Sequence, residues 1–173
     1  MSRSSRVLRA GCLAVALALA AGAEAVAPLP PPAGPPVVGA RAYLVQVQGR
    51  VLWAKAAARR LPPASLTKIM TALLVGEHGA LDAVATVSRS AAAEGGSRLG
   101  LQAGERLRVE ALLTAMLVRS ANDACRALAE HEAGSEAAFV ERMNRRAAAL
   151  GLRDTRFVNA CGWDAEGHHS SAR

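Results

Sequence analysis

Residues 64–77 read Ala-Ser-Leu-Thr-Lys-Ile-Met-Thr-Ala-Leu-Leu-Val-Gly-Glu and directly follow Pro62 and Pro63. The apolar residues recur every three or four positions, which is the period of an α-helix with one broad apolar face. Prolines end any preceding element and can set the start of a helix. The pattern predicts a helix over residues 64–77, with Ser65 in its first turn and Lys68 one turn later on the same face.

Lys68 is one of only two lysines in a chain that carries nineteen arginines. An arginine keeps its proton near neutral pH, whereas a lysine shielded from water can release its proton and act as a base. The free amides at the start of a helix favour negative charge, so a hydroxyl at Ser65 can lose a proton there. Ser65 and Lys68 therefore indicate a nucleophile and its base, although the same spacing also suits a helix cap and a solvated charge.

A second polar group follows an apolar helix that we predict over residues 109–118. Ser120 and Asn122 place a hydroxyl and a carboxamide just after it, where they could pass on a proton and hold a substrate amide. The structural alternative is a helix cap followed by Asp123. By composition alone, both motifs should occur together in roughly one chain in forty. Their combination favours a chemical role.

The remaining sequence predicts a helical body with one short hairpin. Residues 42–47 and 51–54 are β-rich runs on either side of Gly49, which is typical of a β-hairpin. Further segments are predicted as helices over 123–132 and 136–150 and as loops and turns over 154–173.

The first 25 residues are typical of an export signal. Three arginines precede an uncharged apolar run over residues 10–22, and Ala-Glu-Ala at 23–25 suits a signal peptidase. The run is shorter than the roughly 20 residues that span a bilayer. We expect a signal peptide over 1–25, a Pro-rich linker over 26–41 and a folded domain over 42–173, exported across the inner membrane to a periplasmic or extracytoplasmic location. An uncleaved anchor is the alternative.

The charge of the chain argues against a nucleic-acid partner. The net charge is +7, and removal of residues 1–25 leaves eighteen basic and thirteen acidic residues, a net charge of +5. The basic residues are scattered, and aromatic residues make up only 3% of the chain, so no stacking platform for bases is indicated. Weak attraction to an anionic cell envelope is the expected consequence.

Two cysteines, Cys125 and Cys161, lie after the expected signal peptide. They could pair in an oxidising compartment, but sequence does not place them within reach of each other. We favour a buried free thiol at Cys125, because it lies on a predicted apolar helix. The His168-His169 pair lacks a third ligand at a suitable spacing, so we expect no metal site.

The segment 64–71 resembles the nucleophile motif of the D-alanyl-D-alanine carboxypeptidases, the serine-type low-molecular-mass penicillin-binding proteins. The segment 120–125, Ser-Ala-Asn-Asp-Ala-Cys, resembles the second motif of that family. Further similar motifs follow the family's order: Gly95-Gly96-Ser97, Gly100-Leu101, Gly104-Glu105, Phe139-Val140, Met143-Asn144, Leu150-Gly151-Leu152, Phe157-Val158-Asn159, Gly162, Asp164 and Gly167-His168-His169-Ser170. The resemblance implies a D-Ala-D-Ala carboxypeptidase domain over 42–173 with an α/β (α+β) fold, in which an antiparallel sheet lies beside a helical lobe, as in β-lactamases.

The resemblance also implies an acyl-transfer reaction on peptidoglycan stem peptides that end in D-Ala-D-Ala. Ser65 would attack the carbonyl between the two D-alanines, and Lys68 would accept its proton. Ser120 would relay a proton to the departing D-alanine, and Asn122 would hold the substrate amide. The Ser65 amide would supply half of an oxyanion hole. β-Lactams would trap Ser65 as covalent inhibitors, and no metal or cofactor would be needed.

One departure from the family pattern concerns its third motif, Lys-Thr-Gly. Neither Lys55 nor Lys68 is followed by Thr-Gly. In the family this motif binds the substrate carboxylate, completes the oxyanion hole and belongs to a strand of the main sheet. We therefore expect a partial domain with an unpaired sheet edge and an uncovered helix face, and we expect this chain to be inactive on its own.

Three other functions share part of this sequence pattern. A class A β-lactamase shares Ser-x-x-Lys, but no asparagine of this chain follows a glutamate by four positions. A D,D-endopeptidase uses the same residues and stays open as an alternative. A non-catalytic peptidoglycan-binding relative agrees with the absent third motif, but retention of both serines, Lys68 and Asn122 speaks against it. The sequence leaves membrane association and oligomeric state open.

Overall fold

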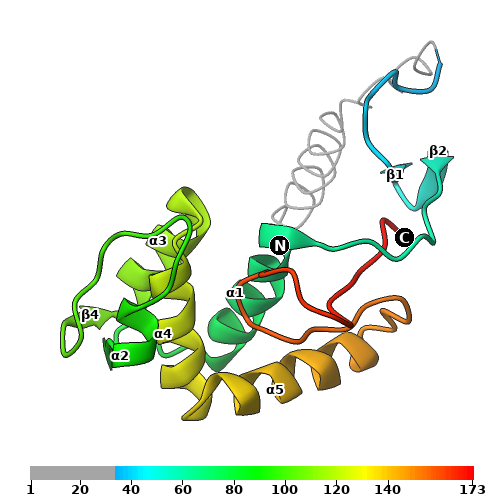
Figure 1. Cartoon of the computed structure of the whole chain (residues 1–173). Helices are drawn as coiled ribbons and strands as arrows, with labels where there is room; N and C mark the ends of the chain where they lie inside the picture. Colours follow the sequence, from blue (N-terminus) through cyan, green and yellow to red (C-terminus); the bar gives the residue numbers. More distant parts are fainter. Residues whose placement is uncertain (1–33) are drawn as a thin grey trace, which may run out of the picture. The chain divides into compact units, whose positions relative to one another are not determined.

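The computed structural model describes residues 34–173 (Figure 1). The expected signal peptide and the first part of the expected linker lie outside the described residues. Residues 34–41 contain no helix or strand. One compact unit comprises Val37–Arg173. None of the helices in this described part is long and apolar enough to cross a membrane.

The predicted helices are confirmed, with ends that differ by a few residues. They are α1 (Thr67–His78), α3 (Val109–Arg119), α4 (Asn122–Ala133) and α5 (Glu136–Ala149), and a short helix α2 (Arg89–Ala92) was not predicted. Residues Ala64–Leu66 form a separate 3₁₀ turn before α1. Ser65 therefore lies in this turn rather than inside the α-helix, because Pro63 allows the tighter start.

Helix α4 is the centre of the helical body. It contacts α1, α2, α3 and α5, and Figure 1 shows these helices gathered around it. Most of α4 is buried, since alanines allow its neighbours to approach closely. The largest fully buried side chains around it include Leu112, Met116, Leu128, Phe139 and Met143. Each such residue contributes about 1.5–3 kcal/mol through burial, so this core supports the residues at the start of α4.

The strands form two small antiparallel sheets within the described residues. The predicted hairpin is confirmed as β1 (Tyr43–Val47) and β2 (Arg50–Lys55). Its turn residues Gln48 and Gly49 both have positive φ, as a tight hairpin requires. Two three-residue strands, β3 (Val84–Thr86) and β4 (Arg106–Arg108), pair with each other and were not predicted, because they are too short to show alternation. Helices beside antiparallel strands agree with the expected fold class.

One side of α1 is buried and the other is exposed. Lys68, Thr71 and Val75 face the helical body, whereas Leu66 and Ile69 remain 68% and 63% exposed. An apolar groove of about 390 Å³ lies beside the exposed side. This arrangement agrees with the expected uncovered helix face.

The expectation of a free thiol at Cys125 is wrong, because Cys125 and Cys161 form a disulfide. Their Cα atoms are 5.9 Å apart, which is a usual separation for a disulfide. The residues after α5 return to α4 and bring Cys161 against it. A sequence separation of 36 residues gave no indication of this return.

Candidate active site

The four candidate residues meet in one hydrogen-bond network. The Ser120 hydroxyl donates to Ser65 Oγ over 2.9 Å, and Lys68 Nζ lies 3.4 Å from the same oxygen. Lys68 Nζ also donates to Asn122 Oδ1 over 2.8 Å. The Ser65 side chain is exposed, whereas Lys68 is only 3% exposed. The first motif therefore contributes a reachable hydroxyl and a buried amine, and the second motif contacts both.

Two strained backbone positions hold the serines in place. Ala64, just before Ser65, has a φ of 48°, and Ser120 at the end of α3 has a φ of 54°. Residues with a Cβ pay roughly 1–2 kcal/mol for this left-handed conformation. Such strain persists where the surrounding structure determines it, and it is typical of functional sites. At Ser120 it ends α3, so that Asn122 can begin α4 after one extended residue.

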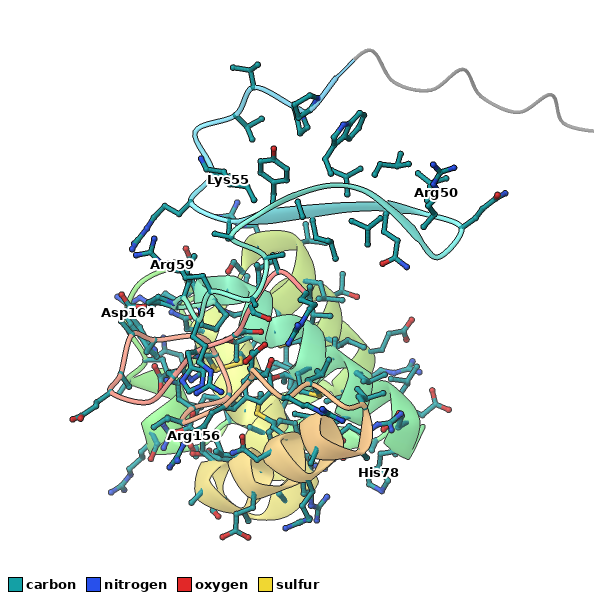
Figure 2. The ribbon with its side chains drawn as sticks, turned by 90° about the vertical axis from the view of Figure 1, so that its right-hand side faces the viewer. Arg50, Lys55, Arg59, His78, Arg156 and Asp164 are labelled. Atoms are coloured by element: carbon teal, nitrogen blue, oxygen red, sulfur yellow. A yellow bond between two sulfur atoms is a disulfide. The ribbon has the colours of Figure 1, made fainter. Side chains whose placement is uncertain are left out.

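Lys68 is surrounded by acceptors. Besides Asn122 Oδ1, its amine donates to the carbonyl oxygen of Cys161 over 2.7 Å. Burial lowers the pKa of Lys68, and the more distant charge of Glu94 offsets this only in part. A lowered pKa increases the neutral fraction of the amine, which is the form that can accept a proton. The other lysine, Lys55, is exposed at the end of β2 (Figure 2).

Asn122 links Lys68 to the loop before α3. Its Nδ2 donates to the carbonyl of Gly95 over 2.9 Å, and its backbone amide donates to the carbonyl of Ser97 over 2.7 Å. Because Oδ1 accepts from Lys68, both ends of the carboxamide are oriented by partners. This orientation holds the loop at 95–97 beside the network.

The network opens onto a cavity of about 380 Å³. Apolar side chains and the turn before α1 form most of its wall. Its lining comprises Pro63, Ala64, Ser65, Leu66, Lys68, Ile69, Met116, Leu117 and Ser120. Among residues 34–173, no three His, Cys, Asp or Glu side chains lie close enough together to hold a metal.

Residues 32–173 match the family model described as D-alanyl-D-alanine carboxypeptidase, peptidase family S11. The chain belongs to this family. It is 45% identical over 130 residues to the D-alanyl-D-alanine carboxypeptidase DacF of Bacillus subtilis, covering 72% of this chain and 33% of that protein.

Other family members show the same partial coverage. The D-alanyl-D-alanine endopeptidase of Pseudomonas aeruginosa is 34% identical, over 81% of this chain and 48% of that protein. Penicillin binding protein 5 from Haemophilus influenzae has a similar structure, with a TM-score of 0.75 and 34% identity over 80% of this chain and 43% of that one. The chain spans between a third and a half of the length of these relatives.

Asp123 anchors a loop in this family member, a role that the sequence analysis missed. It is fully buried and accepts hydrogen bonds of 2.8–3.1 Å from the backbone amides of Leu99, Gly100 and Leu101. Burial by itself raises the pKa of the Asp123 carboxyl, but these bonds and one from the Ala124 amide outweigh it and hold the pKa below its usual range. The carboxylate fixes residues 99–101 against α4.

The loop at 159–163 closes the other side of the site. Asn159 Oδ1 accepts from the backbone amides of Cys161, Gly162 and Trp163 over 2.7–3.2 Å. Gly162 has a φ of 92°, and a Cβ there would overlap the carbonyl of Ala64. The family motif around Gly162 thus serves close packing against the turn that carries Ser65.

A buried hydrogen bond between His168 and Thr67 supports α1 beside Lys68. His168 Nδ1 accepts from the Val158 amide over 3.0 Å, so its proton lies on Nε2, which donates to Thr67 Oγ1 over 2.9 Å. Burial lowers the pKa of His168; the charge of Asp164 opposes this lowering, and His169 adds to it. The neutral ring therefore ties the segment at 168–170 to the first turn of α1.

Proposed function

We propose that this chain carries the nucleophile side of a serine-type D-Ala-D-Ala carboxypeptidase site. The substrates are peptidoglycan stem peptides that end in D-Ala-D-Ala. The observation that carries the proposal is the contact of Ser65 Oγ with both the Lys68 amine and the Ser120 hydroxyl. Family membership supports the reaction class.

In this mechanism the neutral Lys68 amine takes the proton of Ser65 as its oxygen attacks the carbonyl between the two D-alanines. The lowered pKa of Lys68 supports this role. A bond forms between Ser65 Oγ and the carbonyl carbon, and the Ser65 amide stabilises the developing negative charge. The C–N bond then breaks, and the proton passes through Ser120 to the departing amine. Water releases the shortened peptide from Ser65.

β-Lactams provide the direct test, because they acylate the same serine and their acyl form is released slowly. The purified chain is incubated with penicillin G and its intact mass is measured. We expect one adduct that maps to Ser65 and is absent from Ser65→Ala. A folded chain that forms no adduct contradicts the proposal; binding of stem peptides by that chain would instead support a non-catalytic relative.

Turnover is a separate question from acylation. The sequence holds no Lys-Thr-Gly to bind the substrate carboxylate. We therefore expect little release of D-alanine from a D-Ala-D-Ala peptide by this chain, even where penicillin acylates Ser65. A substantial kcat on such a peptide would refute this expectation.

A D,D-endopeptidase is the second candidate, favoured by the relative from Pseudomonas aeruginosa whose name carries that activity. The two activities use the same catalytic residues and differ in the peptide that the groove admits. Assays with purified muropeptides separate the two activities. Cleavage of cross-linked dimers without loss of D-alanine from monomers supports the endopeptidase.

The proposed location is outside the inner membrane, after removal of residues 1–25. The disulfide supports an oxidising compartment, since such bonds are rare in the cytosol. The mass of the exported protein tests the cleavage. We expect a mature chain that begins at Val26, whereas a full-length chain in the membrane fraction supports an uncleaved anchor.

A further inference from the structure

The carbonyl that accepts from Lys68 belongs to a disulfide-bonded residue. Lys68 Nζ lies 2.7 Å from the oxygen of Cys161, and the side chain of Cys161 is joined to Cys125. Cys125 lies on α4, one turn after Asn122, whose Oδ1 is the other close acceptor for Lys68. The disulfide thus ties the two acceptors of the Lys68 amine into one covalent unit.

We propose that the Cys125–Cys161 disulfide positions and desolvates Lys68, so that formation of this bond switches on Ser65 acylation. The proposal rests on the proposed roles of Ser65 and Lys68. Cys125 and Cys161 are positioning residues here, because they act on Ser65 only through the amine.

The segment at 159–163 depends on side chains for its position. It forms no helix or strand. Two other contacts hold its first part, since Thr71 Oγ1 donates to the carbonyl of Ala160 over 2.7 Å and the Ala160 amide donates to Glu136 over 3.0 Å. The disulfide acts on the next residue, Cys161, which carries the acceptor for Lys68.

The disulfide and the segment at 159–163 keep water away from the Lys68 amine. Cys125 and Cys161 are 0% and 3% exposed, and Lys68 is 3% exposed. Reduction adds two electrons and two protons, breaks the S–S bond and leaves two thiols. Two unbonded sulfur atoms need more room than two bonded ones, and this core is closely packed. The loop at 160–162 must then move away from α4, and water reaches the amine.

The pKa of Lys68 follows from this exposure. Its lowered value comes first from burial. Solvation of the amine favours the ammonium form, so reduction raises the pKa toward the usual value. An ammonium group cannot accept the proton of Ser65. Each unit of increase lowers the neutral fraction at pH 7 about tenfold, and acylation should fall in proportion.

The proposed dependence on the disulfide agrees with the change in redox conditions that an exported chain meets. In a reducing cytosol both cysteines stay as thiols, whereas an oxidising compartment supplies a disulfide oxidant that accepts two electrons and two protons and leaves as a dithiol. The chain would then acquire an acylation-competent Lys68 only after it leaves the cytosol.

The first test titrates the lysines directly and does not depend on activity. The chain contains only Lys55 and Lys68, so ¹³C-lysine labelling gives two NMR signals, and exposed Lys55 serves as the internal reference. Cys12→Ala provides a background with only the disulfide pair. We expect the pKa of Lys68 to rise after reduction with dithiothreitol, measured against the Lys55 signal. An unchanged Lys68 pKa overturns the proposal.

The second test follows the rate of penicillin G acylation against pH. In the reduced chain we expect slower acylation at pH 7 and recovery at higher pH, because the profile shifts with Lys68. An equal loss at every pH indicates a merely structural role and overturns the proposal. If the oxidised chain is not acylated either, the proposed function of Ser65 fails, whereas the lysine titration still decides the role of the disulfide.

Reduction could also abolish the cooperative thermal melt. In that case the Lys68 pKa is measured in Thr71→Val. This variant keeps the disulfide and removes only the hydroxyl that holds Ala160. An unchanged Lys68 pKa in Thr71→Val supports positioning by the disulfide. A rise in this variant shows that the Ala160 contact positions Lys68, and it overturns the proposal.

Discussion

Lys68 on α1 and Asn122 on α4 share a hydrogen bond of 2.8 Å between Nζ and Oδ1, and both side chains are buried. The bond joins the two sequence motifs across 54 residues. Within the described part of the chain, no carboxylate forms an ion pair with Lys68. The amine is therefore held by neutral acceptors, which leaves burial as the dominant influence on its pKa.

Lys68→Arg should abolish most acylation while a positive charge is retained. Arginine does not release its proton, so the loss of a general base should slow penicillin acylation by about 10²- to 10⁴-fold. In the unmodified chain, acylation should rise with pH through the lowered pKa of Lys68 and reach a plateau above it. Lys68→Arg should lack this rise. Lys55→Arg is the matched control, and an equal loss in that variant would contradict the assignment.

Ser120→Ala should slow acylation with little effect on folding. It removes the hydroxyl that donates to Ser65 Oγ, and loss of a proton relay costs about 10²-fold or more. The free energy of unfolding should change by only about 1 kcal/mol, the contribution of one hydrogen bond. Acylation followed by intact mass and unfolding in urea measure the two effects. Ser90→Ala, on the exposed side of α2, should change neither; unchanged acylation in Ser120→Ala would exclude the relay.

Gly162→Ala should disturb the turn that carries Ser65. The added Cβ overlaps the Ala64 carbonyl, so the loop or the turn must shift. We expect a loss of about 1–2 kcal/mol from the positive φ and about 1–3 kcal/mol more from the overlap, together with slower acylation. Gly151→Ala is matched, since Gly151 also has a positive φ but no atom near its Cβ position. Equal unfolding free energies for the two variants would show that the overlap is relieved without cost.

Asp123→Asn should loosen the loop at 99–101. The amide cannot accept all the backbone hydrogen bonds that the carboxylate accepts, so the free energy of unfolding should fall by about 2–3 kcal/mol at pH 7.

The pH dependence of this loss has a definite sign. The pKa of Asp123 is lower in the folded chain than in the unfolded chain, where it is about 3.9. Its stabilisation is thus complete well above pH 3.9 and declines as pH falls through the folded pKa. Urea unfolding from pH 7 to pH 3 should show the variant and the unmodified chain converging at low pH. Asp82→Asn, at an exposed side chain, is the control; a constant difference across this range would contradict the role of the carboxylate.

The sequence by itself determined the long helices, the hairpin and the two chemical motifs. These features depend on neighbours within a few residues: apolar spacing over 64–77, the turn at Gly49 and the order of residues in 120–125. These local patterns agree with the fold, because the core around α4 buries residues that have helical apolar spacing. The family resemblance also depended on such spacing.

Only the tertiary structure decided how these parts meet. The strands β3 and β4 are too short to show a period, and their pairing depends on residues that are 20 to 24 positions apart. The free thiol that we favoured at Cys125 was wrong, because Cys125 is an ordinary apolar helix position until the chain returns after α5. The lowered pKa of Lys68 also depends on contacts with residues that are distant in the sequence. A lysine next to a serine motif is exposed or buried according to what packs over it, and here the Cys161 carbonyl and Asn122 do so from distant parts of the chain.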